Sequence, residues 1–402
     1  MIRPFCGEFL VSPLPLELSF NACSYSCAFC FSLLNAPNRT IDMPRLTRFL
    51  ASYRNRDTLE AALLQQGYPI LISNLVDPLA QSNDQQSIPI LKMLVDLDIP
   101  FSLQSRGGKR VDEVLDFIPP VVWYLSINQD DDALRKKIEP GATTIESRLA
   151  LIEKLTKRGH TVLIGFNPFV KEWWRDFPAM ARRVKDAGAW GCWLQSLHFN
   201  QKQLRNMTDK QKIAIGNPIV TRALKRGRPE EVAWRAEGLA AVEEAGLVSY
   251  CTGNEGRSHL FDAYRKVYKK TFPIMQDWIH YCFDRVTPDK PIVSFDEFCH
   301  VMLPLLPTGE FYIRDYIGAN NRELWETFDV PTRGTFKQLL ALIWDMPEMG
   351  HCPIGEPWFG YAGHKNSTQS EIFVDSQKLP FMIFSPSGFG DDEITVEASA
   401  YF

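Results

Sequence analysis

Three of the nine cysteines in this 402-residue chain lie close together, at Cys23, Cys27 and Cys30. Their C-x3-C-x2-C spacing puts three thiols on one short loop. Three thiolates can ligate three irons of a cubane cluster and leave the fourth iron open for chemistry. A zinc site would need a fourth cysteine or a histidine nearby, and the nearest histidine is His160. The spacing therefore predicts a [4Fe–4S] cluster, with a zinc loop or a structural trio as the alternatives.

The composition is that of an ordinary globular protein, with 45% hydrophobic and 23% charged residues and a net charge of −4. No apolar run reaches the roughly 18–20 residues needed to cross a bilayer. The first twenty residues lack the long apolar segment and cleavage site of a secretory signal. We therefore expect a soluble, cytoplasmic protein without a membrane partner, in which clustered cysteines indicate metal binding or catalysis before disulfides.

Short apolar runs rich in strand-forming residues recur along the first 250 residues, with amphipathic helical stretches between them. The expected strands are 16–21, 69–74, 100–105, 121–128, 160–168, 190–198 and 247–252. Strand and helix in alternation predict parallel strands joined by right-handed crossovers. The sequence thus favours an α/β fold, a partial or near-complete (β/α) barrel. The cysteine loop follows its first strand, at the edge where such barrels build their sites.

The clearest helix is predicted over 144–158. Thr143 and Glu146 fit a capping box at its start, and Gly159 lies just past its end. From about residue 256 the alternation is lost. There we expect aromatic-rich helices, then Pro- and Gly-rich turns around 347–363, and one or two short strands in the last twenty-odd residues. The predicted division is a barrel with the cluster loop over 1–255 and a mainly helical extension over 256–402 that covers or flanks the site.

The cysteine motif resembles that of the radical S-adenosylmethionine (SAM) superfamily, and Phe29 occupies the aromatic position that usually precedes the third cysteine there. The resemblance implies that the open iron is chelated by the methionine moiety of SAM. It also implies that one electron, from a flavodoxin- or ferredoxin-type donor, breaks the C5′–S bond. The 5′-deoxyadenosyl radical so released abstracts hydrogen from a substrate.

About 150 residues are similar to the spore photoproduct lyase family, whose members repair a thymine dimer in DNA. The segments that carry the likeness are 73–77, 101–106, 126–128, 138–141 with Arg148, and 165–168. The resemblance assigns the following residues to SAM: Ser73 and Asp77 at the amino group, Arg106 near the carboxylate, Ser126 and Asn128 at the ribose, Arg148 within the same motif, and the backbone around Leu197 at the adenine. As alternatives, Asp77 before Pro78 is a turn former, and Ser126 and Asn128 cap a strand end.

Two positions depart from the lyase family. Asn74 stands where the family has a cysteine that returns hydrogen to the product radical, and Phe31 stands where it has a relay tyrosine. Asparagine has no weak S–H bond, so we expect modification or isomerisation rather than dimer repair. The product radical would then regain hydrogen from 5′-deoxyadenosine or from another donor, of which Cys251 at the end of the seventh strand is better placed than Cys192. Asn74 and Cys251 are the catalytic candidates.

The expected substrate is nucleobase-like, with modified thymine in DNA as one version. Basic stretches at 202–228 and 265–270 would meet a nucleic acid, although charged runs on helices are more often solvated faces. Aromatic residues near the C-terminus would stack on bases. Two alternatives stay open: a radical SAM enzyme acting on a small metabolite or peptide, which the acidic net charge favours, and an iron–sulfur protein without catalysis.

Overall fold

The structure, a computed structural model, describes residues 3–4, 10–20, 23–31, 41–224, 229–249, 260–313, 332–345, 352–365, 370–389 and 395–401. Its centre is an eight-stranded sheet whose strands are β1 (Arg3–Pro4), β2 (Leu16–Leu18), β3 (Ile70–Ile72), β4 (Phe101–Gln104), β5 (Val122–Ser126), β6 (Thr161–Phe169), β7 (Gly191–Ser196) and β8 (Val248–Ser249). Strands β2 to β8 are parallel and adjacent in chain order, and β1 pairs antiparallel with β2. Within the described residues β8 does not close onto β2. The predicted α/β fold of partial-barrel type is therefore confirmed.

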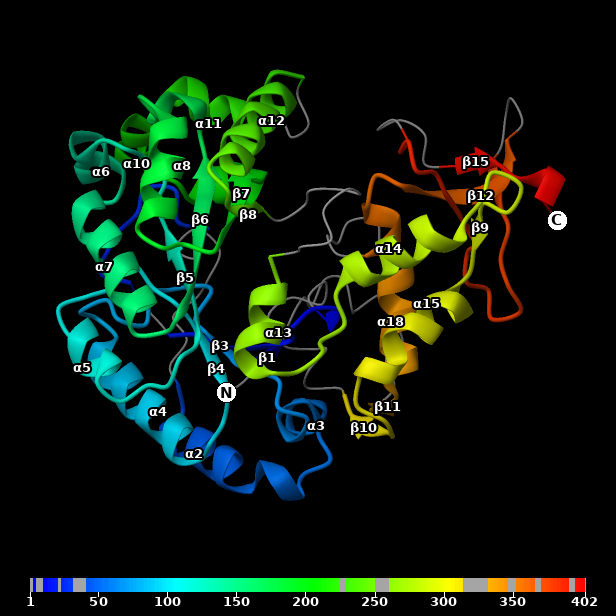
Figure 1. The fold of residues 1–402 in the computed structure, drawn as a ribbon, viewed down its shortest axis with the longest axis horizontal. Coiled ribbons are helices and arrows are strands. Elements are labelled where there is room, and N and C mark those ends of the chain that lie inside the picture. The colour runs from blue at the N-terminus through cyan, green and yellow to red at the C-terminus, as the bar shows by residue number, and fades with distance from the viewer. Residues whose placement is uncertain are drawn as a thin grey trace.

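Helices connect the strands (Figure 1). They are α2 (Met43–Ser52), α3 (Leu59–Gln65), α4 (Asp84–Asp96), α5 (Val111–Leu115), α6 (Asp132–Ile138), α7 (Ile145–Lys157), α8 (Phe177–Asp186), α9 (Gln201–Asn206), α10 (Asp209–Ile215), α11 (Asn217–Arg222) and α12 (Pro229–Glu244). No helix among the described residues is both long enough and apolar enough to span a bilayer.

The sheet has two chemically different faces because side chains alternate along each strand. Leu103, Trp123 and Val162 are cross-strand neighbours on the apolar face and belong to the main hydrophobic core. The opposite face, called the polar face below, carries Glu17, Ser73, Ser102, Gln104, Tyr124, Ser126, Asn167 and Gln195. A sheet with one polar face can present hydrogen-bonding groups to a ligand without disturbing its core.

Helix α13 (Asp262–Tyr268) lies on the side of the sheet away from α4, α5 and α7 (Figure 1). The Tyr268 hydroxyl donates to the Phe101 carbonyl oxygen at 2.5 Å and accepts from the Val122 N–H at 3.3 Å. Tyr264, one turn earlier, is buried, and its ring centroid lies 6.0 Å from that of Tyr268. The helix therefore covers the polar face at the amino-terminal ends of β4 and β5.

Helix α7 matches the helix predicted over 144–158, except at its cap. Thr144, not Thr143, is the N-cap residue, and its side chain accepts from the Ser147 N–H. The Thr143 hydroxyl instead donates to the Arg106 carbonyl oxygen at 3.0 Å. The predicted box of Thr143 with Glu146 is thus wrong by one residue, because the first threonine is used to tie the preceding loop to β4.

The C-terminal part packs helices against a small sheet. Helices α14 (Met275–Arg285), α15 (Phe295–Met302) and α18 (Phe336–Trp344) meet around the fully buried Trp278 and Trp344. The strands are β9 (Ile292–Val293), β12 (Phe359–Lys365), β13 (Ser370–Ile372), β14 (Met382–Phe384) and β15 (Thr395–Glu397), with a separate pair β10 (Phe311–Tyr312) and β11 (Arg333–Gly334). The prediction of turns through residue 363 is wrong from Phe359 onward, because pairing of β12 with β13, β14 and β15 keeps this glycine-containing segment extended.

Candidate functional site

The cysteine loop lies directly after β2 at the carboxyl edge of the parallel sheet. Cys27 is buried and Cys23 and Cys30 are half-buried, and all three are free thiols. Burial raises the pKa of Cys27 to about 12, while burial and the nearby Asp77 carboxylate raise the pKa of Cys23 to about 11. The metal-free thiols of Cys23 and Cys27 are therefore protonated at neutral pH, so metal ligation there would displace their protons.

The turn at 138–141 holds the cysteine loop in place. The Ala28 N–H donates to the Ile138 carbonyl oxygen at 2.8 Å, and the Gly141 N–H donates to the Tyr25 carbonyl oxygen at 3.0 Å. A Cβ atom at position 141 would lie 2.3 Å from the Ser24 carbonyl oxygen. Only glycine permits this close approach of the two backbones.

Phe29 closes the other side of the loop. It is buried and packs against Trp173, with ring centroids 5.5 Å apart. A second hydrophobic cluster surrounds both rings with residues from the loop and from α10 and α11. Here Phe29 is a packing residue of the cysteine loop; that it also belongs to the cofactor site, as the resemblance implies, stays a prediction.

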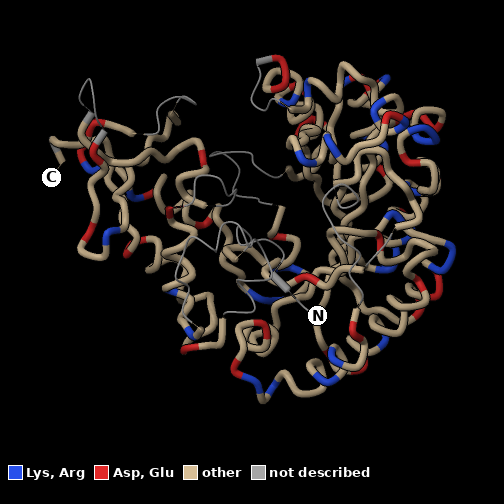
Figure 2. Tube along the Cα trace, turned by 180° about the vertical axis from the view of Figure 1, so that it is seen from behind, with Lys and Arg blue, Asp and Glu red and all other residues tan. Residues whose placement is uncertain are grey.

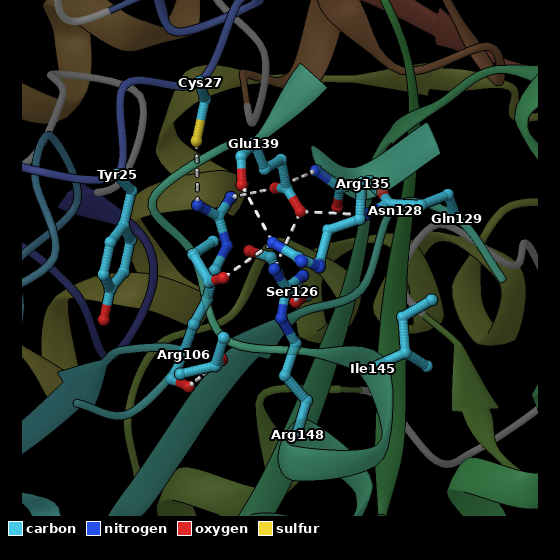
Figure 3. A network of polar contacts seen from close by, with 12 residues as sticks. Tyr25, Cys27, Arg106, Ser126, Asn128, Gln129, Arg135, Glu139, Ile145 and Arg148 are labelled. Carbon is cyan, nitrogen blue, oxygen red and sulfur yellow. Dashed lines mark hydrogen bonds and ion pairs between the residues drawn. The ribbon is translucent and has the colours of Figure 1, made fainter. Parts of the chain in front are cut away.

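A buried ion pair connects Cys27 to the interior (Figure 3). Arg106 donates from Nη1 to the Cys27 Sγ at 3.2 Å, and its Nη2 lies 3.1 Å from Oε1 of Glu139. Glu139 is fully buried. Burial raises the pKa of Glu139, but the guanidinium groups of Arg106 and Arg148 outweigh this effect and lower the pKa to about 2. Glu139 is therefore a carboxylate at neutral pH.

Glu139 is the centre of a larger network that includes four residues assigned above to SAM (Figure 3). Arg148, which is fully buried, contacts Oε2 at 2.8 Å and donates to the Ser126 carbonyl oxygen at 3.0 Å. Asn128 donates to Oε1 at 3.2 Å and Gln129 to Oε2 at 2.9 Å. The Asn128 Oδ1 and Gln129 Oε1 atoms are buried without a hydrogen-bond partner among the described residues. These free acceptors are where the network can receive a ligand's donors.

Asp77 holds two loops together at the same edge. Its carboxylate accepts from the Leu79 N–H at 2.9 Å, the Ser105 hydroxyl at 2.7 Å and the Arg106 N–H at 2.7 Å. Burial raises the pKa of Asp77 by more than these hydrogen bonds lower it. These contacts agree with the alternative interpretation of Asp77 as a turn former. Its carboxylate also lies near Cys23 and raises the pKa of that thiol.

Ser73 and Asn74 lie at the end of β3 beside Glu17. The Ser73 and Ser19 hydroxyl oxygens are 2.7 Å apart, and the Asn74 N–H donates to Glu17 Oε1 at 3.2 Å. The Ser19 hydroxyl also contacts Glu17. Ser73 is buried, whereas Asn74 is half-buried.

Sequence reasoning missed a group of polar side chains at the ends of β5, β6 and β7. Asn167 donates from Nδ2 to Gln195 Oε1 at 3.0 Å and also hydrogen-bonds Tyr124. A Cβ at Gly165 would lie 2.0 Å from the Tyr124 hydroxyl oxygen, so glycine makes room for this ring. Trp193 pairs with Gly165 on the same face and is half-buried. The signal was available, since every second residue of the predicted strands faces the same side.

The remaining candidates are more scattered. Leu197 is half-buried just beyond β7, and Cys251 lies outside the described residues. Cys192 is fully buried next to Ile164 on the apolar face, away from the site. The exposed side chain of Phe31, at 45%, follows the third cysteine.

Some described cations of the basic stretches already have partners. Arg222 pairs with Glu172 at 2.5 Å and lies over the Trp234 ring, and Arg265 pairs with Asp262 and Asp277. Residues 225–228 lie outside the described residues. Figure 2 shows basic and acidic residues interspersed along the helices around the sheet.

The side chains around the cysteine loop suit a cluster better than a single metal ion. Among the described residues, no three His, Cys, Asp or Glu side chains converge as they would around a single ion. A cubane differs, because each thiolate binds its own iron and the sulfurs stand further apart. Three free thiols on one loop, with a guanidinium donating to one of them, fit such a cluster in kind and number.

Comparison with known proteins gives fold-level likeness. No protein-family model and no curated protein matches the chain. Similar solved structures include a variant of spore photoproduct lyase (14% identity, 59% of this chain and 75% of that chain, TM-score 0.43) and the lyase complexed with dinucleoside spore photoproduct (15%, 57% and 73%, TM-score 0.41). SuiB of Streptococcus suis bound to S-adenosylmethionine also matches (16%, 63% and 53%, TM-score 0.39). The family expected from sequence is thus among the similar structures. At these values the likeness carries no weight for function, which rests on the chain's own residues.

Proposed function

We propose that this chain is a radical SAM enzyme. The observation that carries the proposal is the three-cysteine loop after the first parallel strand, backed by the buried Arg106–Glu139 pair. Cys23, Cys27 and Cys30 would hold a [4Fe–4S] cluster. When bound, the reduced cluster would supply the electron that cleaves SAM to methionine and a 5′-deoxyadenosyl radical. The proposed domains are the barrel over 1–255 and the extension over 256–402. The proposed electron donor is of the flavodoxin or ferredoxin type, and the proposed location is the cytoplasm.

The proposed SAM site lies between the cysteine loop and the polar face. Ser73, Ser126 and the backbone near Leu197 would contact the cofactor directly. Asn128 would accept a hydrogen bond through its free Oδ1. Asp77 and Arg148 would support the SAM site without touching the cofactor. Asp77 already accepts hydrogen bonds from neighbouring backbone N–H groups, and Arg148 already contacts Glu139 and the Ser126 carbonyl.

The proposed substrate is a planar, amide-bearing molecule of the nucleobase kind. The Asn167–Gln195 pair on the polar face leaves Asn167 Oδ1 as an acceptor and Gln195 Nε2 as a donor. A neighbouring acceptor and donor complement the N–H and C=O of a pyrimidine edge, and the half-buried Trp193 offers a ring for stacking. Because Asn74 and Phe31 replace the hydrogen-returning pair of the lyase family, we propose modification or isomerisation in place of dimer repair.

A second candidate keeps the same chemistry on a small molecule rather than on DNA. The observation in its favour is that Arg222 and Arg265 are engaged by carboxylates and aromatic rings, which weakens the case for a phosphate-binding surface there. Binding assays with free nucleosides and with duplex DNA distinguish the two.

The experiment that tests the function is anaerobic reconstitution followed by reduction with dithionite in the presence of SAM. Wild-type protein should show the spectrum of a [4Fe–4S] cluster and release 5′-deoxyadenosine. The double variant Cys27→Ser, Cys30→Ser should lose both signals, because oxygen ligands hold the cluster poorly. Cys192→Ala, on the apolar face, is the matched control and should keep both. A cluster retained by the double variant would contradict the assignment.

A further inference from the structure

We propose that Arg106 sets the reduction potential of the cluster, with Glu139 as the residue that positions it. The inference rests on the proposed function, since it concerns the cluster that Cys27 would ligate. It differs from the role that resemblance assigns to Arg106, which is contact with the SAM carboxylate.

Arg106 is held at both its backbone and its side chain. Its N–H donates to the Asp77 carboxylate at 2.7 Å, and its carbonyl oxygen accepts from the Thr143 hydroxyl at 3.0 Å. The two terminal nitrogens of its guanidinium bridge Cys27 Sγ and Glu139 Oε1, at 3.2 and 3.1 Å. With 15% of the side chain exposed, water screens this cation little. Arg106 is therefore a fixed positive charge and a fixed hydrogen-bond donor at one ligand sulfur.

A fixed cation at a ligand sulfur affects the reduction of the cluster more than the assembly of the cluster. Reduction by an external donor adds one electron to the cluster and makes it more negative. An N–H···S hydrogen bond and a nearby cation stabilise that reduced state more than the oxidised one, which raises the potential. The interaction between a cation and the charge on a ligand sulfur is strongest where both are buried, and Cys27 is buried.

Glu139 keeps the guanidinium in this orientation without cancelling the local charge. Arg106 and Arg148 both contact its carboxylate, so two cations face one anion. Asn128 and Gln129 satisfy the remaining carboxylate positions. Glu139 therefore balances one of the two guanidinium charges, and Arg106 remains the cation that contacts the cluster loop directly.

The test is a redox titration of the reconstituted full-length protein without SAM, followed by EPR of the reduced cluster. Arg106→Gln removes the charge and should make the midpoint potential of the cluster more negative. We expect a change of about tenfold in the equilibrium between oxidised and reduced cluster, which corresponds to about 59 mV for one electron. Arg106→Lys keeps the charge but not the two-point bridge and should shift it less in the same direction. Arg183→Gln, which removes an exposed cation that pairs with Glu146 and takes no part in the Glu139 network, is the control and should leave the midpoint unchanged.

A wild-type midpoint in Arg106→Gln overturns the proposal. If that variant does not retain the cluster, an unchanged midpoint in Arg106→Lys overturns it instead. Weaker SAM binding with an unchanged midpoint would assign Arg106 to the SAM carboxylate. Failure of the wild-type protein to assemble any cluster would defeat the proposed function itself, which is a separate result.

Discussion

At the scale of single residues, the site depends on buried charges whose partners come from distant parts of the chain. Glu139 follows α6, yet its carboxylate is contacted by residues after β4, after β5 and within α7. Removing one partner of a buried pair leaves an uncompensated charge, which costs far more than the loss of an exposed pair. This contrast can be measured within one protein.

Arg148→Met should lower the free energy of unfolding of the metal-free protein by about 3 kcal/mol, because the buried Glu139 carboxylate and the Ser126 carbonyl each lose a hydrogen-bond donor while Arg106 still pairs with Glu139. Arg183→Met is the matched control, since Arg183 makes one exposed pair with Glu146 and its loss should cost less than about 1 kcal/mol. Urea denaturation under anaerobic, reducing conditions measures both. Equal costs for the two variants would contradict the importance of burial.

His160 gives the fold a pH dependence of defined sign. Burial and the positive charge of Arg158 lower the pKa of His160 from 6.5 to about 4, and its Nδ1 accepts from the Val121 N–H at 3.1 Å. Below pH 6.5 the unfolded chain therefore binds a proton that the folded chain does not. Stability should fall as the pH drops from 6.5 and level off near 4, with a loss of about 2 kcal/mol between pH 7 and 5. The measurement compares unfolding of wild type and His160→Gln at both pH values, and identical losses would show that His160 is not responsible.

At the scale of elements, the turn after α6 and the cysteine loop form one unit. Gly141→Ala should push these backbones apart, because its Cβ would lie 2.3 Å from the Ser24 carbonyl oxygen. We expect at least a several-fold loss of iron retained after reconstitution and desalting. Pro140→Ala, at an exposed position of the same turn, is the control and should retain iron like the wild type. Full iron content in Gly141→Ala would mean that the loop tolerates the displacement.

Elements with a strong local signal were predictable, and those defined by distant partners were not. Six of the seven parallel strands lie within the ranges predicted and β6 exceeds its range by one residue, because buried runs such as Val122–Ser126 are marked by composition and flanking turns. The cap of α7 was predicted one residue too early because Thr143 and Thr144 are two adjacent threonines that the sequence alone does not distinguish. Only the structure shows that the Thr143 hydroxyl donates to the Arg106 carbonyl oxygen, which leaves Thr144 as the cap. Strand β12 was missed because Gly360 and Gly363 resemble turn residues until their sheet partners are known.

At the scale of the whole molecule, the candidate site was predictable in part. The spacing of the cysteines and their position after the first strand located it. Contacts such as Arg106 with Cys27 could not be foreseen, because they join segments almost eighty residues apart and depend on the side chains between them. The polar face joins β2 through β7, so its composition emerges only once the strand order is known.

Helix α13 has a consequence for how a reactive intermediate would be contained. Its two tyrosines seal the sheet at the starting ends of β4 and β5, where Tyr268 takes up both a carbonyl and an amide of neighbouring strands. Among the described residues, helix α13 thus covers the polar face at the edge of the sheet opposite the cysteine loop. Because a phenolic O–H bond is weaker than a ribose C–H bond, a carbon radical that reached this helix would oxidise a tyrosine. A substrate would therefore have to lie nearer to the cysteine loop than to α13.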